Sequence, residues 1–240
     1  MEGDRNNKNN KNNLTIYGDY LSQPFRAIVC FCKLNKIPYD INFINLGIGQ
    51  HLSDDYKKIN PFGKIPAISL DQENFKMAES CSILRFLASY YKTNEKWYPN
   101  KDPFRRALID QWMDWHHSNS RFALSNFVFS KVFKPKLEEK GIKRETFNTE
   151  QMVGKVLGFL NKILSTRNYI ADDEISIADL IIVCEINQLF LVKYDFSPYK
   201  NVENYLDRIN SIQEVKIVNN IFADVAKKIK LQHSIPKANF

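Results

Sequence analysis

The chain has 240 residues, of which 44% are hydrophobic and 25% are charged, and its formal net charge at pH 7 is +7. This length and composition predict a globular protein of one large domain or two smaller ones. The cysteines form no CxxC pair, so the sequence favours neither a zinc site nor a disulfide framework; they are Cys30, Cys32, Cys81 and Cys184.

The distribution of apolar and basic residues disfavours two further classes of protein. No window approaches 18 uninterrupted apolar residues, and residues 1–13 contain no apolar core of a secretory signal. We therefore expect no membrane span and a reducing, cytoplasmic setting. The positive charges are scattered, and no stacking aromatics alternate with the small basic cluster at Lys227, Lys228 and Lys230. The sequence predicts no nucleic-acid binding, and its positive charge is better suited to attracting a small anionic substrate.

The beginning of the chain predicts a βαβ unit. Residues 1–13 are rich in Asn and Lys, bury no apolar area and are expected to form a disordered tail. Residues 14–17 then predict a strand, residues 24–35 a helix with an apolar stripe, and residues 39–46 a second strand. A strand, a helix and a strand within about thirty residues are typical of this unit.

A hairpin and another helix follow. Residues 60–70 and 73–77 are extended runs separated by two polar residues, which predicts an antiparallel hairpin. Residues 79–91 place their apolar side chains on one helical face. We therefore expect a first domain over residues 14–91, with the element order βαβ-ββα.

The rest of the chain predicts an all-helical domain, residues 102–240. Residues 92–101 are polar and rich in turn-forming residues, so they are the predicted linker. Asp102 and Pro103 form a helix start, with a carboxylate at the N-cap and proline at the first helical position. Helices are predicted over residues 104–129, 151–164, 175–190, 202–210 and 212–222.

The strongest local signal of the chain begins the helix predicted over residues 175–190. Ser176 and Asp179 have the spacing of a capping box in which Asp replaces Glu. Ile175 and Leu180 have the spacing of a hydrophobic staple. Both devices predict that the helix begins directly after Ser176.

Four motifs in this order together resemble the theta class of the glutathione S-transferases. They are LSQPFRA at 21–27, GQHLSDDYKKINPFGKIPAI at 49–68, ES at 79–80 and ISIADL at 175–180. The resemblance runs from about residue 14 to about residue 225. It implies an α/β plus all-α fold, in which an N-terminal thioredoxin-like domain is followed by a C-terminal helical domain. It also implies a homodimeric enzyme of detoxification that conjugates glutathione, a co-substrate, to small hydrophobic electrophiles without a cofactor or a metal.

Ser22 is the predicted catalytic residue. Glutathione must react as a thiolate, and the pKa of an unperturbed thiol is roughly 8.5. A serine hydroxyl at the first turn of a helix can donate its hydrogen to the sulfur, and the helix N-terminus adds partial positive charge. Capping preferences alone would make Ser22 a simple helix cap, whereas the resemblance makes it the sulfur donor. Tyr17 and Tyr20 lie nearby as rival donors.

The resemblance also implies the glutathione contacts. His51 and Lys64 would contact the glycyl end of the tripeptide, and the backbone of Ile65, before a cis Pro66, would pair with its cysteinyl part. Glu79 would accept the γ-glutamyl ammonium group, and Ser80 would bind the adjacent carboxylate. From the residues alone, His51 and Lys64 are ordinary solvated side chains, and Glu79 and Ser80 are ordinary capping residues.

The electrophile pocket is expected to be apolar, lined by the loop after the first strand and by the helix over 104–129. Trp115 and Arg121 are its candidate residues, although the residue types alone predict a core aromatic and a surface arginine. Residues 223–240 correspond loosely to the segment that covers the site in the theta class. His116 and His117 face apart on a helix and predict no zinc site.

Two other functions are compatible with the same motifs. One is a binding or scaffold protein that keeps the fold without turnover. The other is a glutathione-dependent dehalogenase, which begins with the same attack by sulfur and then regenerates glutathione.

Overall fold

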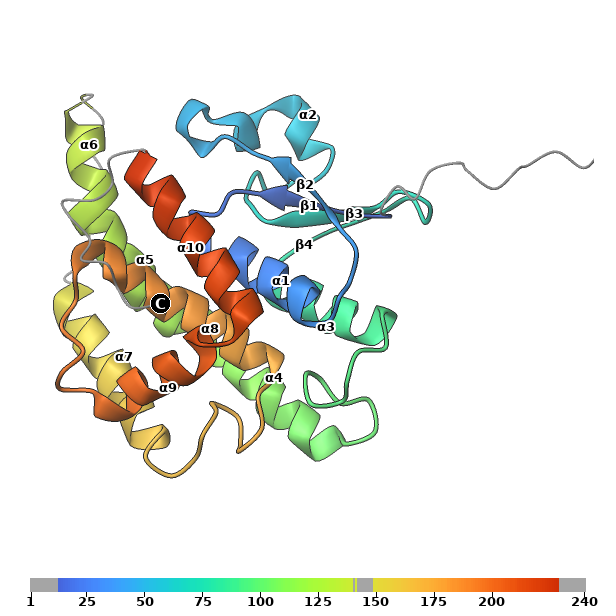
Figure 1. Cartoon of the computed structure of the whole chain (residues 1–240). Coiled ribbons are helices and arrows are strands. Elements are labelled where there is room, and N and C mark those ends of the chain that lie inside the picture. The colour runs from blue at the N-terminus through green and yellow to red at the C-terminus, as the bar shows by residue number, and fades with distance from the viewer. Residues whose placement is uncertain (1–12, 140, 142–148, 229–240) are drawn as a thin grey trace, which may run out of the picture.

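The structure is a computed structural model, and it describes residues 13–139, 141 and 149–228. A four-stranded sheet lies at one end of the molecule (Figure 1). Its strands are β1 (Leu14–Gly18), β2 (Asp40–Phe43), β3 (Ala67–Leu70) and β4 (Phe75–Ala78), in the spatial order β2-β1-β3-β4. β1 is parallel to β2 and antiparallel to β3, and β3 is antiparallel to β4. The predicted βαβ unit and hairpin are confirmed.

Helices cover both faces of this sheet. The helices α1 (Gln23–Leu34) and α3 (Ser80–Tyr90) lie on one face, and the short α2 (Asp54–Lys57) lies on the other (Figure 1). Two 3₁₀ turns, η1 (Leu46–Ile48) and η2 (Gln50–Leu52), connect β2 to α2. The sequence predicted longer extended runs, over 39–46 and 60–70, because local patterns do not show where strand pairing stops.

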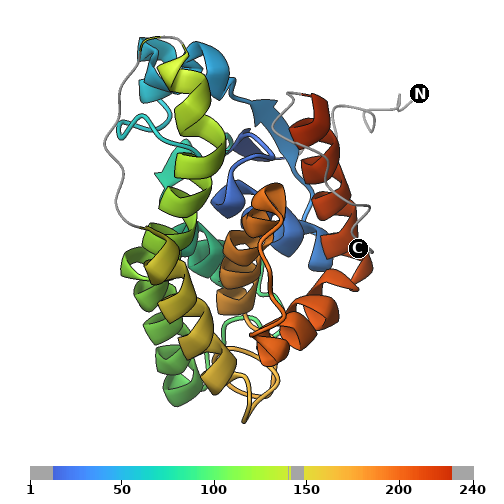
Figure 2. The ribbon, with the colours of Figure 1, turned by 90° about the vertical axis from the view of Figure 1, so that its left-hand side faces the viewer.

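Helix α1 is buried on all sides, whereas the sequence predicted a single apolar stripe. Every residue from Pro24 to Cys32 is buried. One face of α1 packs on the sheet and α3, and another packs on α8 (Ile177–Asn187) and α10 (Gln213–Lys228) of the helical part (Figures 1 and 2). A helix enclosed in this way needs apolar residues around its whole circumference.

The helical part begins at α4 (Pro103–Ser118), which the Asp102 carboxylate caps by accepting the backbone N–H groups of Phe104 and Arg105. It continues through α5 (Ser120–Val128), the π-helical turn η3 (Phe129–Phe133) and α6 (Lys134–Glu138). The remaining elements are α7 (Thr149–Ile163), α8, the 3₁₀ turn η4 (Gln188–Val192), α9 (Lys200–Asn210) and α10. The described part of the second half contains no strand, in agreement with the prediction.

The helix predicted over 104–129 is interrupted at Asn119. The Asn119 backbone has φ −116° and ψ −84°, outside the helical region, and this residue separates α4 from α5. The Asn119 side chain donates to the Trp115 carbonyl at 2.9 Å. Side-chain amides compete with the backbone in this way, and hydrophobic periodicity does not reveal it.

The capping box at α8 is confirmed. Asp179 is fully buried, and its carboxylate accepts hydrogen bonds from the Ser176 backbone N–H at 2.8 Å and the Ser176 hydroxyl at 3.0 Å. It also accepts from the Ile170 backbone N–H and the Tyr205 hydroxyl. Asp179 therefore joins the start of α8 to the preceding loop and to α9.

The prediction of a disordered tail over 1–13 falls on residues 1–12, which lie outside the described residues, and on Asn13. The Asn13 side chain donates to the Glu73 carboxylate at 2.6 Å and accepts from the Gln72 backbone N–H at 3.0 Å. The prediction is wrong for Asn13, because its side chain is bonded to residues of the hairpin turn. The predicted linker, 92–101, lies between α3 and α4 without helix or strand. Of the predicted covering segment, 223–228 belong to α10 and 229–240 lie outside the described residues.

Two findings concern the expectations about cysteines and membranes. All of the cysteines are described, free and buried. Over the described ranges, no helix is both long enough and apolar enough to cross a membrane.

Candidate active site

The register of the sheet brings the predicted site segments together. Tyr17 at the end of β1 pairs with Ala67 at the start of β3, and Ala67 pairs with Ala78 at the end of β4. The chain that leaves β1 leads to Ser22, the chain that enters β3 contains residues 64–66, and the chain that leaves β4 contains residues 79–80. These segments therefore meet at one end of the sheet, where α1 and α3 also begin.

Ser22 is the N-cap residue of α1, but its side chain makes no capping hydrogen bond. Its backbone is extended, with φ −76° and ψ 119°, and the residue is 9% exposed. The loop before it is closed by hydrogen bonds from the Ser22 backbone N–H to the Asp19 carbonyl and from the Leu21 backbone N–H to the Asp19 carboxylate. The backbone therefore holds Ser22 at the helix N-terminus, while the hydroxyl takes no part in capping the helix.

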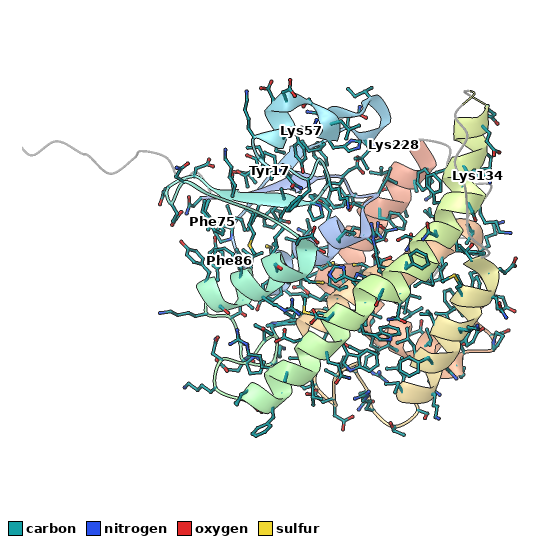
Figure 3. The ribbon with its side chains drawn as sticks, turned by 180° about the vertical axis from the view of Figure 1, so that it is seen from behind. Tyr17, Lys57, Phe75, Phe86, Lys134 and Lys228 are labelled. Atoms are coloured by element: carbon teal, nitrogen blue, oxygen red, sulfur yellow. The ribbon has the colours of Figure 1, made fainter. Side chains whose placement is uncertain are left out.

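The two rival tyrosines are placed differently. Tyr17 lies on the α2 side of the sheet (Figure 3), with its ring 6.5 Å from that of Tyr56 and its hydroxyl 3.3 Å from the Ser69 hydroxyl. Tyr20 is buried, with its ring 5.3 Å from that of Phe25, and burial raises the pKa of its hydroxyl. Tyr17 is therefore on the opposite face of the sheet from α1, and Tyr20 belongs to the core.

The loop before β3 is anchored through the carbonyl of Lys64. This oxygen accepts hydrogen bonds from the Tyr56 hydroxyl at 2.7 Å and from the Asn60 side-chain amide at 2.5 Å. The bond between Ile65 and Pro66 is cis, as the resemblance implied. The Lys64 side chain remains exposed, and Ile65 is half-buried.

His51 lies beside the same loop. A Cβ atom at Gly63 would approach the His51 carbonyl to 3.4 Å, so the η2 turn and the chain before Lys64 are in contact. The Nδ1 atom of His51 is buried and has no hydrogen-bond partner among the described residues. A buried polar atom of this kind is suited to accept or donate a bond to a ligand.

Glu79 and Ser80 begin α3 with an unusual backbone. Glu79 is the N-cap residue and has a positive φ of 69°, with ψ 103°, although it is not glycine. Its side chain makes no capping bond and is exposed, while Ser80 is buried. Strained backbone conformations of this kind persist only where the surrounding structure offsets the strain, and they occur preferentially at ligand sites.

Arg121 connects α5 to the start of α1. Its guanidinium donates to the Gln23 side chain at 2.7 Å, directly after Ser22, and to the Glu185 carboxylate at 2.7 Å. Glu185 is buried and also accepts from Ser125 at 3.1 Å and from Gln188 at 2.7 Å. Arg121 therefore bonds to the residue that directly follows the candidate catalytic serine.

His116 borders the same cluster. Its Nε2 atom lies 3.9 Å from the Glu185 carboxylate, and its Nδ1 atom lies 2.9 Å from the Ser120 hydroxyl. Burial lowers the pKa of the His116 imidazole from 6.5 to about 4. The imidazole is therefore neutral near pH 7, and Arg121 supplies the positive charge that faces Glu185.

Trp115 lies elsewhere in the helical part. Its ring is 5.4 Å from that of Trp112 and 5.5 Å from that of Phe159, so it belongs to an aromatic cluster between α4 and α7. These contacts differ from those of Arg121, which reaches α1 and α8. The structure brings Ser22, Arg121, residues 64–66 and residues 79–80 to the sheet end, but the ring contacts of Trp115 do not connect it to this group.

Sequence reasoning missed Gln23, Arg26 and Glu185. Arg26 and Glu185 stand inside otherwise apolar helical runs, PFRAIVCFC and LIIVCEI. A charged residue in such a run requires a partner when the helix is buried, and this signal could have identified both of them.

The arrangement is suited to a small zwitterionic ligand with an ionisable group near Ser22. Two helix N-termini and the exposed Lys64 side chain attract negative charge, and the exposed Glu79 carboxylate attracts positive charge. Among the described residues, no group of three or more His, Cys, Asp or Glu could hold a metal ion.

The comparisons with protein families agree with this geometry. Residues 26–89 match the model of the glutathione S-transferase N-terminal domain, and residues 124–213 match that of the C-terminal domain. The chain is 34% identical over 175 residues to glutathione S-transferase theta-1 of Homo sapiens, covering 72% of both chains. It is 37% identical over 203 residues to glutathione S-transferase T3 of Arabidopsis thaliana, which covers 81% of this chain. The match spans about a third, 34%, of that relative's length.

A solved human structure has a similar fold. It is a theta-class glutathione transferase in complex with the glutathione conjugate of 1-menaphthyl sulfate. The two folds agree with a TM-score of 0.76 at 26% identity, over 91% of this chain and 92% of the other.

Proposed function

Because the chain belongs to the theta class of the glutathione S-transferase family, we propose that it is an enzyme that joins the sulfur of glutathione to small hydrophobic electrophiles. The observation that carries the proposal is the Ser22 side chain, which stands at the N-terminus of α1 without a capping bond. Ser22 follows β1 at the end of the sheet to which residues 64–66 and 79–80 also lead. In the reaction, the thiolate attacks the electrophilic carbon, a carbon–sulfur bond forms, and the displaced group leaves with the electron pair of its bond.

Ser22 stabilises the thiolate in this proposal. Lowering the pKa of a thiol by about two requires roughly 2.7 kcal/mol. One hydrogen bond to a charged acceptor contributes about 1.5 to 3 kcal/mol, and the positive end of the helix adds to it. These two sources are therefore sufficient without a metal ion.

The remaining contacts hold the tripeptide. The Ile65 backbone pairs with the cysteinyl part, Lys64 and His51 bind the glycyl carboxylate, and Glu79 and Ser80 bind the γ-glutamyl end. Support comes from the anchored carbonyl of Lys64, the unpartnered Nδ1 of His51 and the strained backbone of Glu79.

The electrophile binds between the loop before Ser22 and α5, where Arg121 forms part of the wall. The hydrogen bond from Arg121 to Gln23 supports this role. Trp115 is the weaker wall candidate, because its ring neighbours are Trp112 and Phe159.

Calorimetric titration with glutathione, followed by a conjugation assay against a panel of aryl and alkyl electrophiles, tests the proposal. We expect saturable binding of glutathione and formation of thioether products. Binding without turnover across the panel would favour a scaffold protein. Release of halide with recovery of free glutathione would identify a dehalogenase.

The quaternary structure and the cellular role are part of the same proposal. We expect a homodimer, because large apolar side chains such as Phe62 and Phe104 are 63% and 85% exposed in the single chain. Sedimentation analysis checks this state, and a monomer at micromolar concentration would contradict it. A cytoplasmic role in detoxification accords with the free cysteines and with the proposed chemistry.

A further inference from the structure

Arg26 is a fully buried arginine directly behind the loop that carries Ser22. It lies in the second turn of α1, is 0% exposed and is the bulkiest of the fully buried side chains in the described part of the chain. One terminal nitrogen donates to the Tyr20 carbonyl at 2.7 Å and to the Leu21 carbonyl at 3.2 Å. These are the two residues that immediately precede Ser22.

The same guanidinium also binds the helical part. Its second terminal nitrogen donates to the Cys184 carbonyl of α8 at 3.0 Å. The guanidinium lies over the ring of Phe222 in α10, 3.9 Å from the ring centre. Arg26 thus connects the site loop to two helices of the other domain.

The hydrogen-bond acceptors of Arg26 are backbone carbonyls and not carboxylates. The charged and titratable groups that face it are Cys184 and Glu185 of α8, Cys30 of α1 and Arg121 of α5. Burial lowers the pKa of the guanidinium, but arginine is the most basic of the side chains and stays charged near neutral pH. The core behind Ser22 therefore contains a positive charge bonded only to neutral acceptors.

We propose that Arg26 is a positioning residue of the conjugation reaction, which holds the carbonyls of Tyr20 and Leu21 so that the Ser22 hydroxyl meets the sulfur, and whose buried charge favours the thiolate. This inference rests on the proposed function of Ser22. An apolar side chain could fill the interface between α1, α8 and α10 at a lower desolvation cost. An apolar residue would neither fix the geometry of the loop nor supply positive potential behind Ser22.

The test separates geometry from charge with two substitutions. Arg26→Lys keeps the charge but loses the planar array of donors, and Arg26→Met loses both. The ultraviolet absorbance of bound glutathione thiolate is measured against pH, together with kcat and KM for conjugation. Circular dichroism and thermal unfolding report whether each variant folds.

Arg26→Met is expected to raise the pKa of the bound thiol by about one, which lowers the rate about tenfold below that pKa. The rate should recover to within about twofold of the unmodified enzyme at a pH about two above the thiol pKa, where ionisation is complete. Arg26→Lys should show a smaller rise in the thiol pKa, and the affinity for glutathione should change little in both variants.

Arg105→Met is the matched control. Arg105 is also a largely buried arginine that donates to carbonyls, those of Lys96 and Glu174. It differs from Arg26 in that it also pairs with the Asp172 carboxylate, at 2.6 Å, and braces the segment between α3 and α4. Its substitution should lower the unfolding temperature without moving the thiol pKa.

An unchanged thiol pKa and pH profile in folded Arg26→Lys and Arg26→Met would overturn the inference. Failure of both variants to fold, with Arg105→Met folded, would assign Arg26 a structural role only and would overturn it as well. Ser22→Ala identifies which proposal fails. If Ser22→Ala raises the thiol pKa and the Arg26 variants do not, the inference alone is wrong, whereas absence of thiolate in the unmodified enzyme contradicts both.

Discussion

Ser22 and Ser53 are both N-cap residues, but they use their hydroxyls differently. Ser53 begins α2, and its oxygen accepts the Tyr56 backbone N–H at 3.2 Å. Ser22 begins α1 without such a bond. The sequence could not distinguish these two cases, because the same residue type and position are compatible with either rotamer. The structure therefore shows that the Ser22 side chain is not a simple cap, and its role as a sulfur donor stays a proposal.

Ser22→Ala should lower the conjugation rate by about one to three orders of magnitude, because one donor to the developing anion is lost. The affinity for glutathione should remain nearly intact, since the other contacts hold the tripeptide. Steady-state kinetics and calorimetric titration measure the two quantities. Ser53→Ala is the control and should reduce stability by about 1 kcal/mol without changing the rate. Full turnover in Ser22→Ala would assign the sulfur to another donor.

The buried His116 predicts a dependence of stability on acid pH. Its pKa is about 4 in the folded chain and near 6.5 when unfolded, so between these values the unfolded state binds more protons. The free energy of unfolding should therefore decrease as the pH falls from about 6.5 to about 4, by at most about 3 kcal/mol from this residue.

Denaturant unfolding at a series of pH values checks this contribution. His116→Asn keeps a polar group near Ser120 but does not titrate, so its stability should depend less on pH in that range. His117→Asn, at the exposed neighbouring position, should retain the full dependence. Equal pH profiles for the two variants would contradict the account.

At the scale of elements, Asp179 shows how one carboxylate orders several segments. It accepts hydrogen bonds from the backbone before α8, from Ser176 and from Tyr205 of α9. Asp179→Ala should reduce the free energy of unfolding by about 3 to 5 kcal/mol, because buried donors are left without acceptors. Asp224→Ala, at an exposed position of α10, should change it by less than about 0.5 kcal/mol. Denaturant unfolding of both variants measures the difference, and similar values would contradict this role of Asp179.

The sequence predicted those elements correctly that depend on interactions between neighbouring residues. The capping box at Ser176, the helix start at Asp102 and the hairpin between β3 and β4 depend on neighbouring residues, and all are present. The interruption at Asn119 depends on a side-chain bond to Trp115, which periodicity does not contain. The complete burial of α1 depends on α8 and α10, which lie far along the chain.

At the scale of the whole molecule, the candidate site is a product of both domains. Arg121 of the helical part bonds to Glu185 and reaches Gln23 beside Ser22, and Arg26 reaches back to Cys184 and Phe222. The resemblance predicted Ser22 from its position in a motif and Arg121 from its alignment with a theta-class arginine. The roles of Arg26 and Glu185 could not be predicted in this way, because their partners are defined only when the two domains pack together.

The contact between Arg121 and Glu185 in the helical part leads to a prediction for the electrophile site. Glu185→Gln keeps the shape of the side chain but removes the charge that faces Arg121, so Arg121 should be held less firmly at Gln23. We expect a several-fold rise in KM for the electrophile and little change in glutathione affinity. Kinetics with both substrates varied provide the measurement, and a change confined to glutathione would contradict the assignment of Arg121 to the electrophile pocket.

The most direct test of the central claim is a crystal structure of the protein with bound glutathione. We expect the sulfur within hydrogen-bond distance of the Ser22 hydroxyl and the tripeptide backbone paired with Ile65. A sulfur remote from Ser22, or a sheet end that remains empty at saturating glutathione, would contradict it.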